Sequence, residues 1–376
     1  MHFVALSAIP SPQDLNIAMN AVPVDVVVSF ITQRFTLASL SREKTMPTLE
    51  LSPARIDQER WECLTELMVS NLMDPYDENT SNIAHMAFDD QTDEGRKAYE
   101  QGGFDCVKTP DGRIILCVDY EFSRQYELYD GKVYRRSFGQ LHHRKQTKKS
   151  KKYTPMPNYP FRKLYPTFDA FMVNHWGCER QEGIDRYGYY FNPNGQWDWW
   201  QIGGRWPFQF LVKDDCPSAV TGELSSLFKK APQRGAPDGY RWVAGARKSD
   251  IAWGIMKEFR RNEATEAFRQ REAWFNAGQV PAEYAGWIEI VEDGLVSYGD
   301  YLYRKGETLE TYLHNIGLSE ERQYPISTFA CVDAYGWTDQ GWGESEHQAE
   351  EWFNKVSSFI DKQPDDTLLI SVDYHS

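Results

Sequence analysis

The chain has 376 residues, of which 41% are hydrophobic and 26% charged, and this length can bury a substantial core in one large domain or two of ordinary size. Its formal net charge of −14 argues against general nucleic-acid binding, because neutralising phosphates requires a positive surface. The six cysteines show no CxxC or Cys/His spacing, so neither a structural zinc site nor a disulfide framework is indicated.

The apolar pattern also bears on location. No apolar run reaches the roughly 18 residues of a membrane span, and no positively charged segment precedes an apolar one at the start. Cysteines without a disulfide pattern fit a reducing compartment. We therefore expect a soluble, cytoplasmic protein with no membrane partner.

Two elements are predicted at the start of the chain. Residues 2–9 are apolar and β-prone, and prolines follow them, which predicts a strand. Apolar residues recur at helical spacing over 54–73, and Pro75 stops that helix. The prediction is therefore a first strand followed, after a loop, by an amphipathic helix.

The segment Asp74–Asn79 follows this helix and concentrates oxygen-bearing side chains. Asp77 and Asn79, with Glu78 between them, are candidates for ligand binding, for a hard cation or for acid–base chemistry. The alternative is a polar helix terminator with an Asx turn. No EF-hand spacing is present, and we expect no metal.

A basic run at 142–152 is the concentrated positive charge of an acidic chain, and three prolines follow it. We predict a linker or loop at 142–160 between two α+β regions, 1–141 and 161–376, which can share one sheet. The run at 144–152 is the one segment that offers nucleic acid a contact. It lacks the interleaved aromatic residues that single-strand binding uses.

The most distinctive stretch is Tyr187–Trp206, which holds four of the chain's 13 tryptophans. Asn192-Pro193-Asn194-Gly195 is a turn signal, so residues 187–191 and 197–202 are predicted to pair as a Trp-rich hairpin. So much aromatic area must be largely buried, as core or as a binding site.

Charged residues within this stretch suggest a site. Alternation along the second strand places Asp198 beside Trp200, a desolvating neighbour, and Arg205 can return to Asp198 as a bidentate partner after Gly203-Gly204. His175, at the end of a helix capped by Thr167, is the third candidate for acid–base work. The alternative is a structural ion pair and a capping histidine. The candidate ligand-binding side chains here are those of Tyr189, Asn192, Asn194, Trp197, Trp199 and Trp200.

The run Tyr-Gly-Tyr-Tyr-Phe-Asn-Pro-Asn-Gly-Gln-Trp-Asp-Trp-Trp-Gln-Ile-Gly-Gly-Arg-Trp resembles the signature of an uncharacterised family of bacteriophage and bacterial proteins. Asp74–Asn79 and Asp366–His375 fit the same resemblance. The chain departs from it at Gln196, where relatives have Lys, and at Trp200, where they have Tyr. The resemblance implies a phage or prophage setting, hence a host cytoplasm, and brings no activity with it.

The last part of the chain is the most regular. A strand at 328–334, a helix opened by the capping box Ser345-x-x-Gln348, and a strand at 367–374 predict that the last strand returns to the same sheet. Asp333, Asp373 and His375 then lie near strand ends, where ligands gather in open α/β sheets. Earlier, Ser249 is expected to cap a long helix to about residue 276.

We therefore predict an α+β fold, in which a mixed or antiparallel sheet joins the first strand, the central hairpin and the last strand, with helices on one face and a Trp-lined cleft. Three functions are weighed. The first is a phage or mobile-element accessory protein, with counter-defence as one such role, that binds a host macromolecule, such as a protein, or a small ligand through the cleft. The second is a hydrolase using Asp198 and Arg205. The third is a structural module without a site. No nucleotide-binding loop, nucleophile elbow or HExxH motif is present, and we expect no cofactor.

Overall fold

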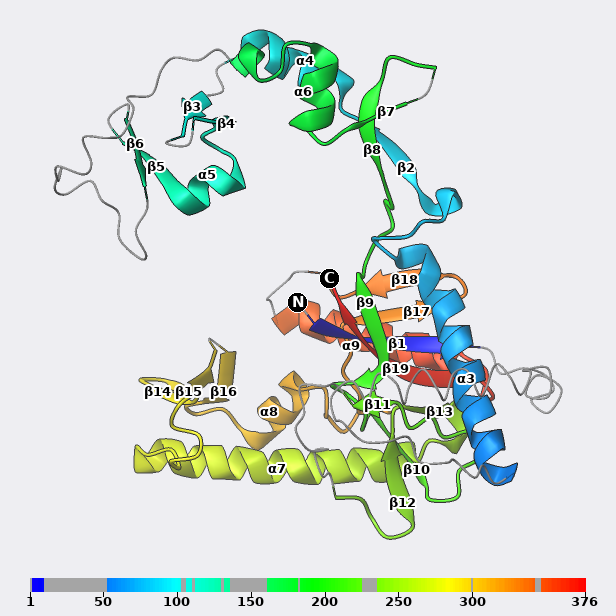
Figure 1. The fold of residues 1–376 in the computed structure, drawn as a ribbon. Coiled ribbons are helices and arrows are strands. Elements are labelled where there is room, and N and C mark those ends of the chain that lie inside the picture. Colours follow the sequence, from blue (N-terminus) through cyan, green and yellow to red (C-terminus); the bar gives the residue numbers. More distant parts are fainter. Residues whose placement is uncertain are drawn as a thin grey trace, which may run out of the picture. The chain divides into compact units, whose positions relative to one another are not determined.

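The protein is described from a computed structural model, shown in Figure 1, which has an α+β fold as predicted. The described residues are 2–9, 53–102, 106–109, 112–129, 132–135, 161–181, 183–224, 235–298, 300–341 and 346–376. They form two compact units. Met1–Asn79 with Asn194–Ser376 is the main unit, and Thr80–Pro193 is the inserted unit.

These units differ from the predicted regions 1–141 and 161–376. The chain leaves the main unit after Asn79 and returns at Asn194, so one unit is inserted into the other rather than following it. The predicted linker, 142–160, lies outside the described residues. A hydropathy pattern marks strands and helices but does not show which distant strands pair, and that pairing decides the unit to which each belongs.

The main unit is organised around a seven-stranded sheet with the order β11-β9-β19-β1-β17-β18, in which β13 also pairs with β19. β1 runs parallel to β17, and β9 parallel to β11, while the other pairs are antiparallel. The predicted mixed sheet joining the first and last strands is therefore confirmed. The strands are β1 (His2–Ile9), β9 (Trp199–Gly204), β11 (Glu223–Leu224), β13 (Gly245–Arg247), β17 (Ala330–Asp333), β18 (Gly336–Asp339) and β19 (Leu368–His375).

The centre of this sheet is the antiparallel pair of β1 and β19. Their register runs without a break from His2 opposite His375 to Ile9 opposite Leu368. Most side chains of both strands are buried, which explains why the two segments read as nearly continuous apolar runs. The N and C labels therefore lie near each other in Figure 1.

Helices cover both faces of the sheet, whereas the sequence analysis expected them on one. Ala5 of β1 belongs to the core cluster that includes α3 (Pro53–Met73). Its neighbour Leu6 belongs to the cluster that includes α9 (Glu346–Lys362). Successive residues of a strand point to opposite faces, so α3 and α9 lie on opposite sides of β1. Helix α3 has the predicted bounds to within one residue.

A long arm extends from this core. Helix α7 (Trp253–Ala277) starts after a 3-10 turn at Lys248–Asp250, later than the predicted cap at Ser249, and ends at Gly278 in the left-handed conformation. Its first half packs against the main core, and its second half carries a separate core. The remaining elements of this part are β10 (Phe210–Lys213), β12 (Tyr240–Val243), β14 (Glu289–Val291), β15 (Gly294–Ser297), β16 (Asp300–Arg304) and α8 (Leu309–Asn315).

The inserted unit is built from small sheets and short helices. Its sheets are β2-β8-β7, β3-β4 and β5-β6, and its largest buried side chains include Phe171 and Met172 of α6. Thr167 caps α6 by accepting the Ala170 N–H, as predicted. The elements are β2 (Ala87–Asp90), α4 (Thr92–Gln101), β3 (Cys106–Lys108), β4 (Ile114–Leu116), α5 (Tyr120–Gln125), β5 (Tyr126–Tyr129), β6 (Lys132–Arg135), α6 (Phe168–Asn174), β7 (Glu179–Arg180) and β8 (Tyr187–Phe191).

Short 3-10 turns complete the described elements, at Asp74–Tyr76, Ile83–His85 and Phe161–Lys163. No helix within the described residues combines the length and the apolar character needed to cross a bilayer.

The predicted Trp-rich hairpin is wrong. β8 pairs with β2 and β7 in the inserted unit, whereas β9 pairs with β19 and β11 in the main unit. Residues 192–198, which connect β8 to β9, lead the chain from the inserted unit back into the main unit. They do not form a tight turn between two paired strands. Residues 193–194 do form a turn. β9 nevertheless pairs with β19, which is longer and more deeply buried than β8.

Candidate functional site

Three segments that are far apart in the sequence meet at one end of β19. Asp77 and Trp197 form a parallel bridge, and Glu78 N–H donates to the Trp197 carbonyl at 2.8 Å. The Asp198 N–H donates to the His375 carbonyl at 2.9 Å. We call Asp77, Glu78, Asp198, His375 and Ser376 the junction cluster, because the inserted unit leaves the main unit beside it.

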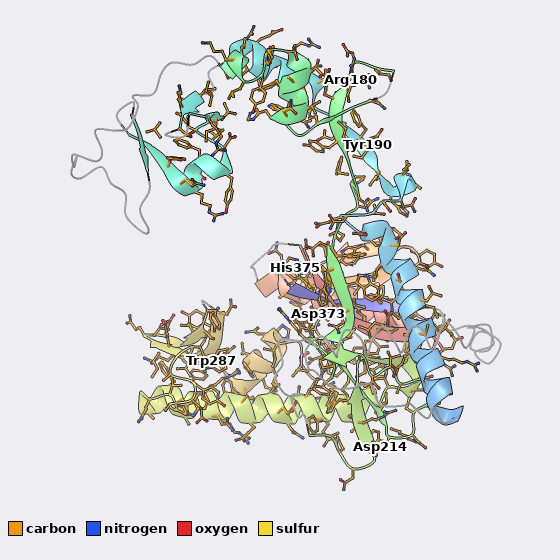
Figure 2. All side chains as sticks on the ribbon, viewed as in Figure 1. Arg180, Tyr190, Asp214, Trp287, Asp373 and His375 are labelled. Atoms are coloured by element: carbon orange, nitrogen blue, oxygen red, sulfur yellow. The ribbon has the colours of Figure 1, made fainter. Side chains whose placement is uncertain are left out.

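The cluster contains one carboxylate–imidazole pair. His375 Nδ1 lies 2.8 Å from Asp198 Oδ1, and the two side chains are 38% and 40% exposed. Figure 2 shows His375 at the end of β19, with Asp373 farther along that strand. A carboxylate on Nδ1 fixes the ring's orientation and favours the tautomer protonated there. Asp198 therefore has a titratable partner, but it is His375 rather than Arg205.

Arg205 serves a different carboxylate. Its backbone N–H donates to Asp373 Oδ2 at 3.0 Å, and Asp373 is fully buried. Gly203 and Gly204 have φ of 77° and 52°, and a Cβ on Gly204 would collide with the Asp373 carboxylate. The Gly-Gly corner turns the chain toward Asp373, so the predicted ion pair between Arg205 and Asp198 is wrong in the described structure.

His175 lies in the inserted unit, at the end of α6, and not in the junction cluster. Its ring packs against those of Tyr165 and Phe171, with centroids 5.4 and 5.2 Å away. Burial lowers its pKa, because the charged imidazolium loses hydration there. The packing interpretation therefore describes His175, and the structure brings His375 to Asp198 instead.

The tryptophans of the central stretch mainly build the core. Trp197 and Trp200 meet edge to face at 6.4 Å and pack on the α3 side of the sheet, and Trp197 Nε1–H donates to the Met73 carbonyl at 2.9 Å. Trp199 remains 42% exposed. Trp197 and Trp200 therefore belong to the core instead of lining the predicted cleft, and only Trp199 stays exposed.

The other predicted ligand-binding residues are spread over both units. Asp77 Oδ1 accepts the Asn79 N–H at 2.8 Å, which is the Asx turn of the alternative interpretation. Tyr189 is half-exposed on β8, Asn192 is buried, and Asn194 is exposed. The pKa of Tyr189 is raised, chiefly by its hydrogen bond to Asp89. Of these residues, Asp77 is the one whose backbone bridges to Trp197, the residue before Asp198.

A second candidate site is a cavity of about 930 Å³ between α9 and the hairpin of β17 and β18. We call it the α9–β18 cavity. It lies at the carboxyl end of β17, and two tryptophans, Trp337 and Trp352, line it. Its charged groups are those of Asp333, Glu351, Lys355 and Lys362. A Trp-lined cavity thus exists, but on tryptophans other than those predicted.

Polar groups in the cavity are firmly held. Asp333 Oδ1 accepts the Tyr335 N–H at 2.8 Å, and its Oδ2 accepts from Gln363 Nε2 at 3.3 Å. Burial, reinforced by the Asp333 charge, raises the pKa of the Cys331 thiol to about 12. The thiol is therefore protonated at neutral pH and lines the cavity as a small apolar group rather than a nucleophile.

Asp333 was predicted at a strand end, whereas no residue of α9 was predicted to take part in a site. Trp352, Lys355, Phe359 and Lys362 share one helix face at spacings of three and four, a signal available in the sequence. That face becomes a cavity wall only because β18 folds back beside β17, which the helix pattern does not reveal.

No family model, curated protein or solved structure matches the chain. Within the described residues, no group of three or more His, Cys, Asp and Glu side chains is placed to hold a metal ion.

Proposed function

We propose that the protein binds a small ligand in the α9–β18 cavity. The cavity's size, about 930 Å³, carries this proposal, because ligand pockets usually have about 300–1,000 Å³ of space lined by aromatic and apolar groups with a few polar ones. Its place at the carboxyl end of β17 is where open sheets commonly bind ligands. The resemblance of the central stretch makes a phage or mobile-element accessory role part of this proposal.

Filling the cavity tests this function. Ser358, exposed and lining the cavity, can be replaced in S358W, so that an indole occupies the ligand's space. Glu350, exposed on the same helix but outside the lining, gives the matched control E350W. A metabolite library is screened by thermal shift against the full chain and both variants.

A true ligand at about 100 times its dissociation constant stabilises the protein by about 2.7 kcal/mol, or roughly 5 °C for a unit of this size. We expect that shift in the wild type and E350W and its loss in S358W. A shift that survives in S358W contradicts binding in this cavity, as does a library without any stabilising member.

The Asp198–His375 pair supports acid–base catalysis in the junction cluster as a second candidate function. It revises the hydrolase hypothesis, with His375 in place of Arg205 as the partner of Asp198. The variants D198N and H375Q should each lose turnover on a panel of chromogenic ester and phosphate substrates while keeping the wild-type melting temperature. If the wild-type protein turns over none of the panel, or if both variants match it, this candidate is rejected.

A further inference from the structure

The α9 wall of the α9–β18 cavity carries two lysines, Lys355 and Lys362, and one glutamate, Glu351. Lys355 and Lys362 lie two helical turns apart on α9, about 10 Å along its axis, and both are exposed. Lys248 and Lys257 of the same unit each have a carboxylate oxygen within 4.0 Å. Lys355 and Lys362 form no ion pair with any described residue. Two unneutralised ammonium groups on one cavity wall suit an anionic ligand.

An aromatic ring stands at the rim. Tyr335, in the turn between β17 and β18, is 98% exposed and lines the cavity. Its backbone is held by the bond from its N–H to Asp333, so the ring is presented from a fixed turn. Trp352 and Phe359, which belong to or pack against the buried core, add apolar lining to the same cavity. This combination suits a planar ring, because aromatic side chains stack on such rings from one face.

The carboxylate of Asp333 adds an acceptor to the same cavity. A carboxylate has room for about four hydrogen bonds, and Asp333 accepts one from the Tyr335 N–H and one from Gln363 Nε2. Hydroxyl or amino groups of a ligand can donate to it. Glu351 also lines the cavity, so the lining does not favour an anion through net charge alone. The discriminating feature is the separate placement of cationic, aromatic and acceptor groups.

We propose that the ligand is a phosphorylated compound with a planar ring and a hydroxylated spacer, the chemistry of a nucleoside monophosphate. Lys355 or Lys362 binds the phosphate, Tyr335 stacks on the base, and Asp333 accepts from the sugar hydroxyls. This inference rests on the proposed function of the cavity. It needs no glycine-rich phosphate loop, because side chains rather than backbone N–H groups bind the phosphate.

Isothermal titration of the full chain tests the ligand class. The probes are AMP, GMP, CMP and UMP, the four matching nucleosides, and inorganic phosphate. We expect at least one nucleotide to bind at least tenfold more tightly than its nucleoside and than phosphate. K355A or K362A should weaken that nucleotide about tenfold and leave the nucleoside unchanged, whereas Y335A should weaken both. K305A, at an exposed lysine outside the cavity lining, is the control and should change nothing.

The possible outcomes separate this inference from the function on which it rests. If no nucleotide binds but a library compound still binds in an S358W-sensitive manner, the cavity is a ligand site and the nucleotide class is wrong. Nucleotide binding that S358W leaves intact, or that K305A weakens as much as K355A and K362A, also overturns the inference. If no probe and no library compound binds, both proposals fall.

Discussion

The main and inserted units solve the problem of burying a core in different ways. The main unit has one seven-stranded sheet with β1 and β19 at its centre. These two strands are more than 350 residues apart in the sequence. The inserted unit uses separate sheets of two or three strands with short helices. The main unit's stability therefore depends on long-range pairing, whereas the inserted unit depends on local contacts.

The two units also differ in net charge. The main unit has 23 basic and 40 acidic residues, a net charge of −17, and the inserted unit has 18 and 15, a net charge of +3. The acidity that argued against nucleic-acid binding thus belongs to the main unit alone. The net charge of the whole chain therefore describes neither unit, and the two units can be tested separately.

The largest expected effect tests the dependence on β19. Ile370 is fully buried in the middle of β19, and I370A should lower the free energy of unfolding of the main unit by about 2–5 kcal/mol through lost burial and a cavity. Chemical denaturation followed by tryptophan fluorescence measures it. V118A, at an exposed position of the inserted unit, is the control and should change little. A loss below about 1 kcal/mol for I370A would contradict the central role of this strand.

The Gly-Gly corner gives the next largest effect. Gly204 and Gly278 both have positive φ, of 52° and 63°, but only a Cβ on Gly204 meets the Asp373 carboxylate. We expect G278A to cost about 1 kcal/mol from backbone strain, and G204A about 2–4 kcal/mol because steric conflict adds to it. Equal losses in thermal melts of the two variants would show that the contact with Asp373 does not matter.

A smaller effect concerns pH and the inserted unit. The pKa of His175 is lowered by burial, so the folded state resists protonation that the unfolded chain accepts near its ordinary pKa of about 6.5. The inserted unit should be at full stability above that pH and lose stability as the pH falls through the lowered pKa. Hydrogen exchange of α6 amides at pH 7.5 and 5 measures this loss. H175Q should flatten the dependence, and an unchanged slope in H175Q would exclude this histidine as its cause.

The smallest expected effect is that of removing the inserted unit. The backbone carbonyl of Tyr76 accepts hydrogen bonds from the N–H groups of Gln196 and Trp197 at 2.7 and 3.2 Å. The segments just before and just after the inserted unit are therefore joined within the main unit. Replacing 80–193 by a short Gly-Ser linker should leave the main unit's melting temperature within a few degrees. A main unit that fails to fold without the insertion would show that the two-unit division is not one of stability.

The sequence predicted local elements well and their partners poorly. The strand at 2–9, the helix at 54–73 and the last strand follow from apolar spacing and prolines, which act over a few residues. The pairing of Trp197–Ile202 with residues 187–191 failed, because pairing depends on which distant strand offers the larger buried surface. Asp198 was correctly singled out, but its partner His375 comes from the other end of the chain by a β-pairing that spacing does not encode.

The place of β19 between β9 and β1 has a consequence for synthesis. β1, β9 and β13 all leave the ribosome before β19, so until β19 emerges their edges lack the N–H and C=O partners that it supplies. Translation of the inserted unit, by contrast, is complete 183 residues before Ser376. A stalled or truncated translation product would thus carry a finished module on an open sheet, a species suited to capture by chaperones or to edge-to-edge association.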